Sequence, residues 1–318
     1  MLKKICFTLL CVILGAVFII SGFTKGGFPF FHRFTSPIEP FEMTFVDLGV
    51  ANWRVAPFIA RLLIGFEFFI GLALILHVRL RKVVYKLGIA LLLVFSIYLI
   101  LLMAFSGSKG NCGCFGTVFS MTPMWALIKN VIMLLVFLVL YKYHEGWENK
   151  IAKYILWLAL VASLILPFIW NPVALDYSEA YLNQPENNFE LPLDTLYNNA
   201  SLNVPPKTLS KGKHVISFMS LTCPHCRIAA KKIRIMHELN PEISFYFVLN
   251  GDTSKLEPFF TETKTQGIPH CMLLGRPFVY LAGTEMPAIY LVNNSVVEHV
   301  VDYMSLDQKE VEGWLNGK

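Results

Sequence analysis

Hydrophobic residues along this chain gather into five long apolar segments, all within the first 170 positions. About 20 consecutive apolar residues suffice for a helix to cross a bilayer. The segments run over 5–23, 55–76, 83–105, 123–141 and 151–170. Lys3 and Lys4 precede the first segment as in a signal peptide, but a small-x-small cleavage site is missing and further apolar segments follow. We therefore expect five transmembrane helices.

A different pattern follows residue 188, where short apolar runs alternate with segments of helical spacing. The polar stretch 171–188, with its prolines and asparagines, predicts a tether in front of this region. The predicted strands are 214–219, 243–249, 288–292 and 296–301, and the predicted helices are 227–239, 256–263 and 306–315. The fold class is thus a multi-pass α-helical membrane bundle followed by an α/β domain with a small mixed sheet.

Composition agrees with a membrane domain fused to a soluble one, since 55% of the 318 residues are hydrophobic and only 15% are charged. The net charge of +5 could suggest nucleic-acid binding. However, the basic residues cluster in short loops between apolar segments, where they orient helices. We therefore exclude nucleic acid as a partner.

The distribution of Lys and Arg sets the orientation of the bundle. The segments 1–4, 77–86 and 141–153 are rich in basic residues, whereas 24–54 and 106–122 are poor in them. The positive-inside rule then places the N-terminus in the cytoplasm. Five crossings put everything after residue 170 outside, which predicts a bacterial inner-membrane protein with a periplasmic C-terminal domain.

One pair of cysteines lies in Thr222-Cys223-Pro224-His225-Cys226, after a predicted strand and at the start of a predicted helix. That context makes a CxxC pair redox-active. At a helix N-terminus the Cys223 thiolate is stabilised by free N–H groups and the helix dipole, and His225 adds a nearby donor. Cys226, one turn along, would resolve a mixed disulfide. Pro224 suits the first helical turn.

The region 189–318 resembles the thioredoxin superfamily. The run from Gly212 to Phe218 is similar to the lead-in of TlpA-type proteins, and Met286-Pro287 is similar to the family's cis-proline loop. The resemblance implies that this loop lies beside the dithiol and binds substrate backbone. The Pro-His dipeptide resembles the DsbA type, which implies a strongly oxidising disulfide.

The second pair is Cys112 and Cys114, in a loop between the third and fourth apolar segments. A disulfide across one residue needs a kinked backbone to bring its Cα atoms within about 7 Å, and Gly113 permits the kink. Such a strained disulfide is labile and oxidising. Two free cysteines, or a link to another loop, are the alternatives. A structural zinc site shared by both pairs is a further alternative, but it leaves Pro287 unexplained, so we expect no metal.

Residues 1–145 resemble the DoxX-like superfamily and, within it, MauE-type proteins. The matching stretches are Ser21-Gly22-Phe23-Thr24-Lys25, Arg61 through Glu67 to Gly71, Cys112-Gly113-Cys114-Phe115-Gly116 and Lys129-Asn130. MauE-type proteins are associated with disulfide formation in a periplasmic amine dehydrogenase, which implies a membrane partner for dithiol oxidation. The expected domains are a bundle over 1–145, a fifth helix with a linker over 146–188, and a thioredoxin-like domain over 189–318.

Two charged residues fall inside the second apolar segment. Glu67 would lie about 18 Å into its helix and Arg61 about half as deep. Intramembrane charges are costly and point to function. Because the two are six residues apart, they face different sides, and each needs a partner such as Lys25 or Lys129. They predict either a structural charge network or a proton and quinone site.

These features predict a membrane-anchored thiol–disulfide oxidoreductase. Cys223 and Cys226 would oxidise periplasmic thiol-containing proteins, Cys112 and Cys114 would reoxidise them, and electrons would pass to a quinone or a respiratory partner, with no covalently bound cofactor. One alternative is a reductive relay for haem attachment or disulfide isomerisation. Another is a non-catalytic assembly factor for a cysteine-rich client. Cys6 and Cys11 are interpreted as packing residues. Cys271 is expected to be buried, with a shuttle role as the alternative.

Overall fold

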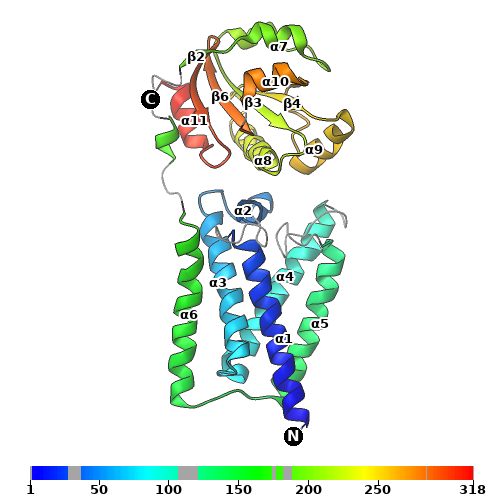
Figure 1. Cartoon of the computed structure of the whole chain (residues 1–318), viewed down its shortest axis with the longest axis vertical. Coiled ribbons are helices and arrows are strands. Elements are labelled where there is room, and N and C mark those ends of the chain that lie inside the picture. The colour runs from blue at the N-terminus through cyan, green and yellow to red at the C-terminus, as the bar shows by residue number, and fades with distance from the viewer. Residues whose placement is uncertain are drawn as a thin grey trace. The chain divides into compact units, whose positions relative to one another are not determined.

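The computed structural model describes residues 2–27, 37–106, 121–173, 177–181, 188–283 and 285–317 (Figure 1). The chain divides into two compact units, Met1–Val173 and Ala174–Lys318. The fifth apolar helix lies in the first unit, together with the four that precede it.

The first unit contains the five predicted apolar helices, each long enough to cross a membrane. They are α1 (Leu2–Lys25), α3 (Ala56–Ile75), α4 (Tyr85–Ser106), α5 (Pro123–Tyr143) and α6 (Lys150–Trp170). Helix α3 is the most buried of the five, because α1 and α6 both pack against it, while α4 pairs with α5. A π-helical turn, Leu80–Val84, leads into α4. The prediction of a multi-pass helical bundle is confirmed.

Glycines let α3 approach its neighbours closely. A Cβ atom on Gly15 would lie 2.7 Å from the carbonyl oxygen of Gly71, and one on Gly71 would lie 2.8 Å from that of Gly15. On another side of α3, a Cβ atom on Gly65 would lie 2.9 Å from the carbonyl oxygen of Ser163. Small residues at such crossings allow the backbone contact that holds helices together in lipid.

A short helix between the first two spans, α2 (Glu39–Asp47), was not predicted. Its first turn contains Pro40, and it buries Met43 and Val46. With only nine residues and a mixed composition, it carries too little periodicity to be distinguished from a loop. This helix supplies Glu42, which is the acidic partner of Arg61 in α3.

The second unit is built on a six-stranded sheet of order β2-β7-β6-β3-β4-β5. Strand β3 (Lys213–Ser220) is parallel to β4 (Phe245–Asn250) and antiparallel to β6 (Ala288–Asn293), which forms a hairpin with β7 (Val296–Val301). These four strands confirm the predicted ones. The short edge strands β2 (Phe189–Glu190) and β5 (His270–Met272) were not predicted.

Helices cover this sheet, as expected of a thioredoxin-like domain. They are α7 (Leu193–Asn199), α8 (Pro224–Leu239), α9 (Leu256–Thr263), α10 (Arg276–Ala282) and α11 (Gln308–Leu315). Residues of α7 and α10 share one apolar core with Phe218 of β3 and Tyr290 of β6. The predicted mixed α/β fold is therefore confirmed.

The predicted tether over 171–188 is wrong for residues 178–181. These form a 3-10 turn, Ser178–Tyr181, on the soluble unit. The Tyr181 hydroxyl accepts a hydrogen bond from the Asp307 amide (3.1 Å) and donates one to the Ser305 carbonyl (3.3 Å). Polar composition suggested a free chain, but the hydrogen bonds of one partly buried tyrosine dock this turn.

Candidate active site

Cys223 occupies the junction between β3 and α8. It is the N-cap of α8, with extended backbone angles, and Pro224 begins the helix. The Cys226 amide donates a hydrogen bond to the Cys223 sulfur at 3.3 Å. Cys226 itself is fully buried, whereas Cys223 is half-buried. The Ser220 amide, at the end of β3, donates to the Cys226 sulfur at 3.4 Å.

These contacts shift the pKa values of the two thiols in opposite directions. A hydrogen bond from the Cys226 thiol, amide donors of Cys226 and His225, and the charge of His225 lower the pKa of Cys223 to about 6, against the opposing effect of burial. At pH 7 the thiolate then exceeds the thiol about tenfold. The hydrogen bond to Cys223, together with burial, raises the pKa of Cys226 far above its ordinary value. These properties suit Cys223 to act as a nucleophile and Cys226 to act as a resolving thiol.

The loop before β6 lies next to Cys223. The Met286–Pro287 peptide bond is cis, as the resemblance implies. The Met286 carbonyl oxygen lies 3.9 Å from the Cys223 sulfur and accepts a weak hydrogen bond from it. A backbone acceptor in this place is positioned to meet an extended peptide that approaches Cys223.

Two further contacts hold the start of α8, and neither was anticipated from the sequence. The His225 ring stacks on the Tyr303 ring, with centroids 4.5 Å apart and planes 6° from parallel. Arg227 pairs with Glu262 of α9 at 2.8 Å. Tyr303 follows a strand in a loop, and nothing in its local sequence marks it as a neighbour of the dithiol.

Cys112 and Cys114 fall at positions outside the described residues, which resume at Met121. Their role as a second dithiol therefore stays a prediction from the sequence.

Glu67 pairs with Lys25, one of the two lysines proposed for it from the sequence. Its carboxylate pairs with Lys25 of α1 at 2.7 Å, and both side chains are only 2% exposed. The Ser21 hydroxyl donates to the same oxygen at 3.1 Å. The other carboxylate oxygen, Oε2, is buried and has no hydrogen-bond partner among the residues that the structure describes. The Lys25 ammonium also lies over the Phe41 ring, 4.9 Å from its centroid.

Arg61 faces a different set of partners, as the six-residue spacing predicts. Its guanidinium bonds the Glu42 carboxylate of α2 at 2.6 Å and the Asn171 carbonyl at 2.6 Å. Glu42 was missed because α2 was not predicted, and Asn171 was missed because only helix packing brings the end of α6 to Arg61. Arg61 therefore connects α2, α3 and the end of α6, which is a structural arrangement.

A known protein family matches the membrane unit of the chain. Residues 3–143 match the family described as "Methylamine utilisation protein MauE". The resemblance inferred from the sequence is confirmed. The chain joins a membrane unit that is similar to this family over residues 3–143 to a unit built on a six-stranded mixed sheet.

One relative extends over both parts. "Protein TlpB" of Flavobacterium psychrophilum is 25% identical over 356 aligned positions, which cover 94% of each chain. Among solved structures, a secreted Mycobacterium tuberculosis disulfide oxidoreductase homologous to E. coli DsbE is 17% identical, with a TM-score of 0.32 over 39% of this chain and 98% of its own. MTB DsbF is 18% identical, with a TM-score of 0.30 over 42% of this chain and 96% of its own.

The dithiol geometry and the apolar helices indicate the general class of activity. The chain is a multi-pass membrane protein and a thiol–disulfide oxidoreductase.

Proposed function

We propose that the soluble unit oxidises the cysteines of client proteins and that the membrane unit reoxidises it. The observation that carries this proposal is the low pKa of Cys223, about 6. A stabilised thiolate favours the reduced form of the pair, and a pair whose reduced form is favoured has an oxidising disulfide. The Pro-His dipeptide between the cysteines supports the same direction.

The electron balance runs in three steps. A client thiolate attacks Cys223 of the disulfide and releases Cys226, and the second client thiol then displaces Cys223, so the client gains a disulfide and Cys223/Cys226 becomes a dithiol. The Cys112–Cys114 disulfide takes the two electrons and two protons by the same exchange. Finally, a quinone takes two electrons and two protons from Cys112/Cys114 and becomes a quinol.

The positive-inside orientation supports an inner-membrane location with the soluble unit in the periplasm. Several of the basic residues at the expected inner face hold acidic partners: Arg79 and Lys82 both pair with Glu148, at 3.6 and 2.9 Å, and Arg81 pairs with Glu145. Acidic residues contribute little to the positive-inside rule, so these pairs do not change the orientation. The clients would then be periplasmic proteins with reduced cysteines.

The buried group of Ser21, Lys25 and Glu67 supports a proton-handling role in the membrane unit. A carboxylate deep in the bundle is costly, and its Oε2 atom lacks a hydrogen-bond partner within the described part of the chain. Quinone reduction needs two protons. An intramembrane carboxylate paired with an ammonium is able to relay them.

The redox potential of Cys223/Cys226 tests the direction. The full chain with Cys112 and Cys114 both changed to Ser would be equilibrated in detergent with glutathione buffers, and the Cys223-containing peptide would be quantified. We expect a potential well above the ~−270 mV of thioredoxin. A value at or below it would instead favour a reductive relay for haem attachment or isomerisation. Failure of the wild-type protein to turn over unrelated reduced clients would favour a non-catalytic assembly factor.

A further inference from the structure

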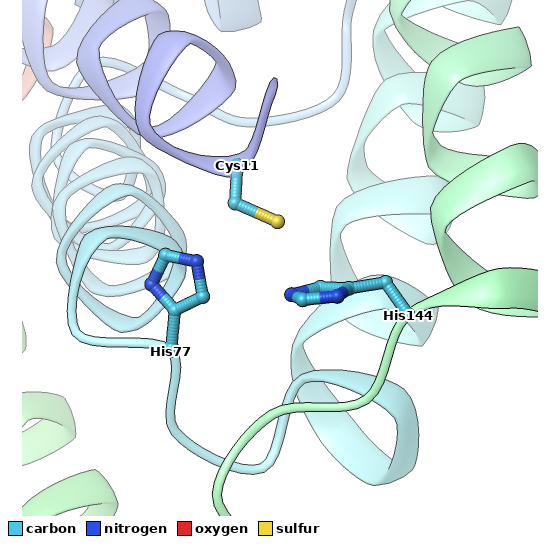
Figure 2. A group of neighbouring side chains, drawn as sticks. All are labelled: Cys11, His77 and His144. Atoms are coloured by element: carbon cyan, nitrogen blue, oxygen red, sulfur yellow. The ribbon is translucent and has the colours of Figure 1, made fainter. Parts of the chain in front are cut away.

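Three metal-binding side chains converge at one end of the membrane unit, away from Glu67 along α3. Cys11 comes from α1, His77 follows α3, and His144 follows α5 (Figure 2). Their ligand atoms all lie within 4.8 Å of one another. Figure 2 shows the sulfur and the two imidazole rings turned toward a common centre. Nothing in the dithiol chemistry uses this cluster.

The backbone holds the two histidines in place. Val78 and Trp147 form an isolated parallel bridge between the loop after α3 and the loop after α5. The Trp147 amide donates to the His77 carbonyl at 2.7 Å, and the Arg79 amide donates to the Trp147 carbonyl at 3.0 Å. A Cβ atom on Gly146 would collide with that His77 carbonyl, so this close approach requires glycine. The two loops are thus fixed against each other.

The hydrogen bonds of these side chains leave their ligand atoms ready to bind. Nδ1 of His77 lies 2.9 Å from the Ile75 carbonyl oxygen, which can only accept a hydrogen bond and so assigns the N–H to Nδ1. The Nε2 lone pair of His77 is then free, and Nε2 of both His77 and His144 is buried without a hydrogen-bond partner among the described residues. A ligating histidine whose other nitrogen donates to a carbonyl is the usual arrangement at a metal centre.

The Cys11 sulfur is also positioned to act as a metal ligand. Its side chain is fully buried, and its sulfur lies 3.3 Å from the hydroxyl of Tyr85, itself fully buried at the start of α4. A hydroxyl in this position is able to donate to a thiolate. The basic residues of the adjoining loops are engaged by Glu145 and Glu148, which reduces their repulsion of a cation.

We propose that Cys11, His77 and His144 bind a zinc ion, with a fourth position open to water or another ligand. A thiolate and two imidazoles suit Zn²⁺ rather than Mg²⁺ or Ca²⁺. Zn–S and Zn–N bonds of about 2.3 and 2.0 Å place ligand atoms about 3.5 Å apart, so the three side chains close in by about 1 Å on binding. The ion would connect α1 with the loops that follow α3 and α5.

Metal binding to the full chain in detergent tests this site. Cys112, Cys114, Cys223 and Cys226 would all be changed to Ser, which removes the competing dithiols. Co²⁺ serves as the spectroscopic probe and Zn²⁺ as the competitor. We expect one Co²⁺ per chain with thiolate-to-cobalt charge-transfer absorption, displaced by one Zn²⁺, and a zinc-dependent rise in the unfolding temperature.

Single changes in that background assign the ligands. Cys11→Ser should abolish the charge-transfer band, and His77→Asn and His144→Gln should each weaken Zn²⁺ binding more than about tenfold, while Tyr85→Phe weakens it about tenfold through the thiolate. The matched control is Cys6→Ser, an exposed cysteine on the same helix, which should change nothing. Metal-free unfolding curves identify any variant that fails to fold.

Three outcomes would overturn the proposal. They are binding of less than one equivalent of Zn²⁺, a charge-transfer band that survives Cys11→Ser, and stoichiometric binding of Cu⁺ without measurable binding of Zn²⁺. In each case the cluster would be a packing arrangement or a site for another cation.

Discussion

The Cys223 sulfur lies where β3 ends and α8 begins, so it receives hydrogen bonds from groups that the helix leaves unpaired. The same turn buries Cys226 behind it. One half-buried, acidic thiol and one buried, weakly acidic thiol result from their offset of three residues on a helix. The sequence predicts this arrangement fully, because CxxC after a buried strand fixes both positions.

The ionisation of Cys223 is directly measurable. We predict that alkylation of Cys223 in the reduced chain rises with pH around a midpoint near 6 and is constant above about pH 7, because its folded pKa is about 6. Peptide mass spectrometry after timed exposure to iodoacetamide would follow it. Cys271 is the internal control, since burial raises its pKa to about 11 and it should react slowly. A Cys223 midpoint near 9 would contradict the low pKa.

Glu67 allows the two interpretations of the buried charges to be separated. Glu67→Gln alone leaves Lys25 buried without its counter-charge, and removal of one partner from a buried pair costs about 3–5 kcal/mol. Glu67→Gln combined with Lys25→Met removes both charges, so the double variant should fold more stably than the single one. If Glu67 relays protons, the double variant still reoxidises Cys112/Cys114 slowly.

The measurement is the rate of reoxidation after a pulse of reductant, in membranes that contain equal amounts of folded protein. Wild-type rates in the double variant would show that the pair of charges is structural only. Sequence reasoning found Glu67 and proposed Lys25 for it, but it could not choose between Lys25 and Lys129, because helix packing decides which lysine approaches.

Among the elements, the crossing of α1 and α3 depends on the absence of side chains at Gly15 and Gly71. A single methyl group on Gly71 would meet Ile19 at 2.7 Å and the Gly15 carbonyl at 2.8 Å. We predict that Gly71→Ala destabilises the membrane unit by about 1–3 kcal/mol, the usual cost of overpacking. Thermal unfolding in detergent would measure it.

The control for this substitution is Gly313→Ala in α11, where an added Cβ has no atom within 4 Å. It should leave stability unchanged or raise it, since alanine favours a helix more than glycine does. Equal stability of the two variants would mean that α1 and α3 do not pack as closely as described.

Elements with a clear apolar or periodic pattern were predictable, and elements without one were not. Twenty apolar residues define a span regardless of context, and α9 and β7 have the predicted bounds. By contrast, α2, β2, β5 and α10 are short, and tertiary contacts rather than periodicity define them. The zinc-binding cluster was missed for a related reason: Cys11, His77 and His144 come from three separate segments, and only helix packing brings them together.

At the scale of the whole molecule, the chain carries a membrane unit and a soluble dithiol unit on one polypeptide, and the linker between them is shorter than its composition suggests. Residues 178–181 dock on the soluble unit through Tyr181. The relay requires that Cys223 meet Cys112 or Cys114 within one chain, from a domain tied to the end of α6. The same-side topology of the two pairs, derived from the basic residues, is the condition for this exchange.

The redox state of Cys223/Cys226 in growing cells tests the central claim most directly. Free thiols would be trapped with acid and labelled with a mass-adding alkylating agent, in wild type and in a variant with Cys112 and Cys114 both changed to Ser. We predict that the pair is mostly oxidised in wild type and accumulates as a dithiol in the variant. A pair that is reduced in wild type, or that stays oxidised in the variant, would contradict an oxidative relay from Cys223/Cys226 through Cys112/Cys114.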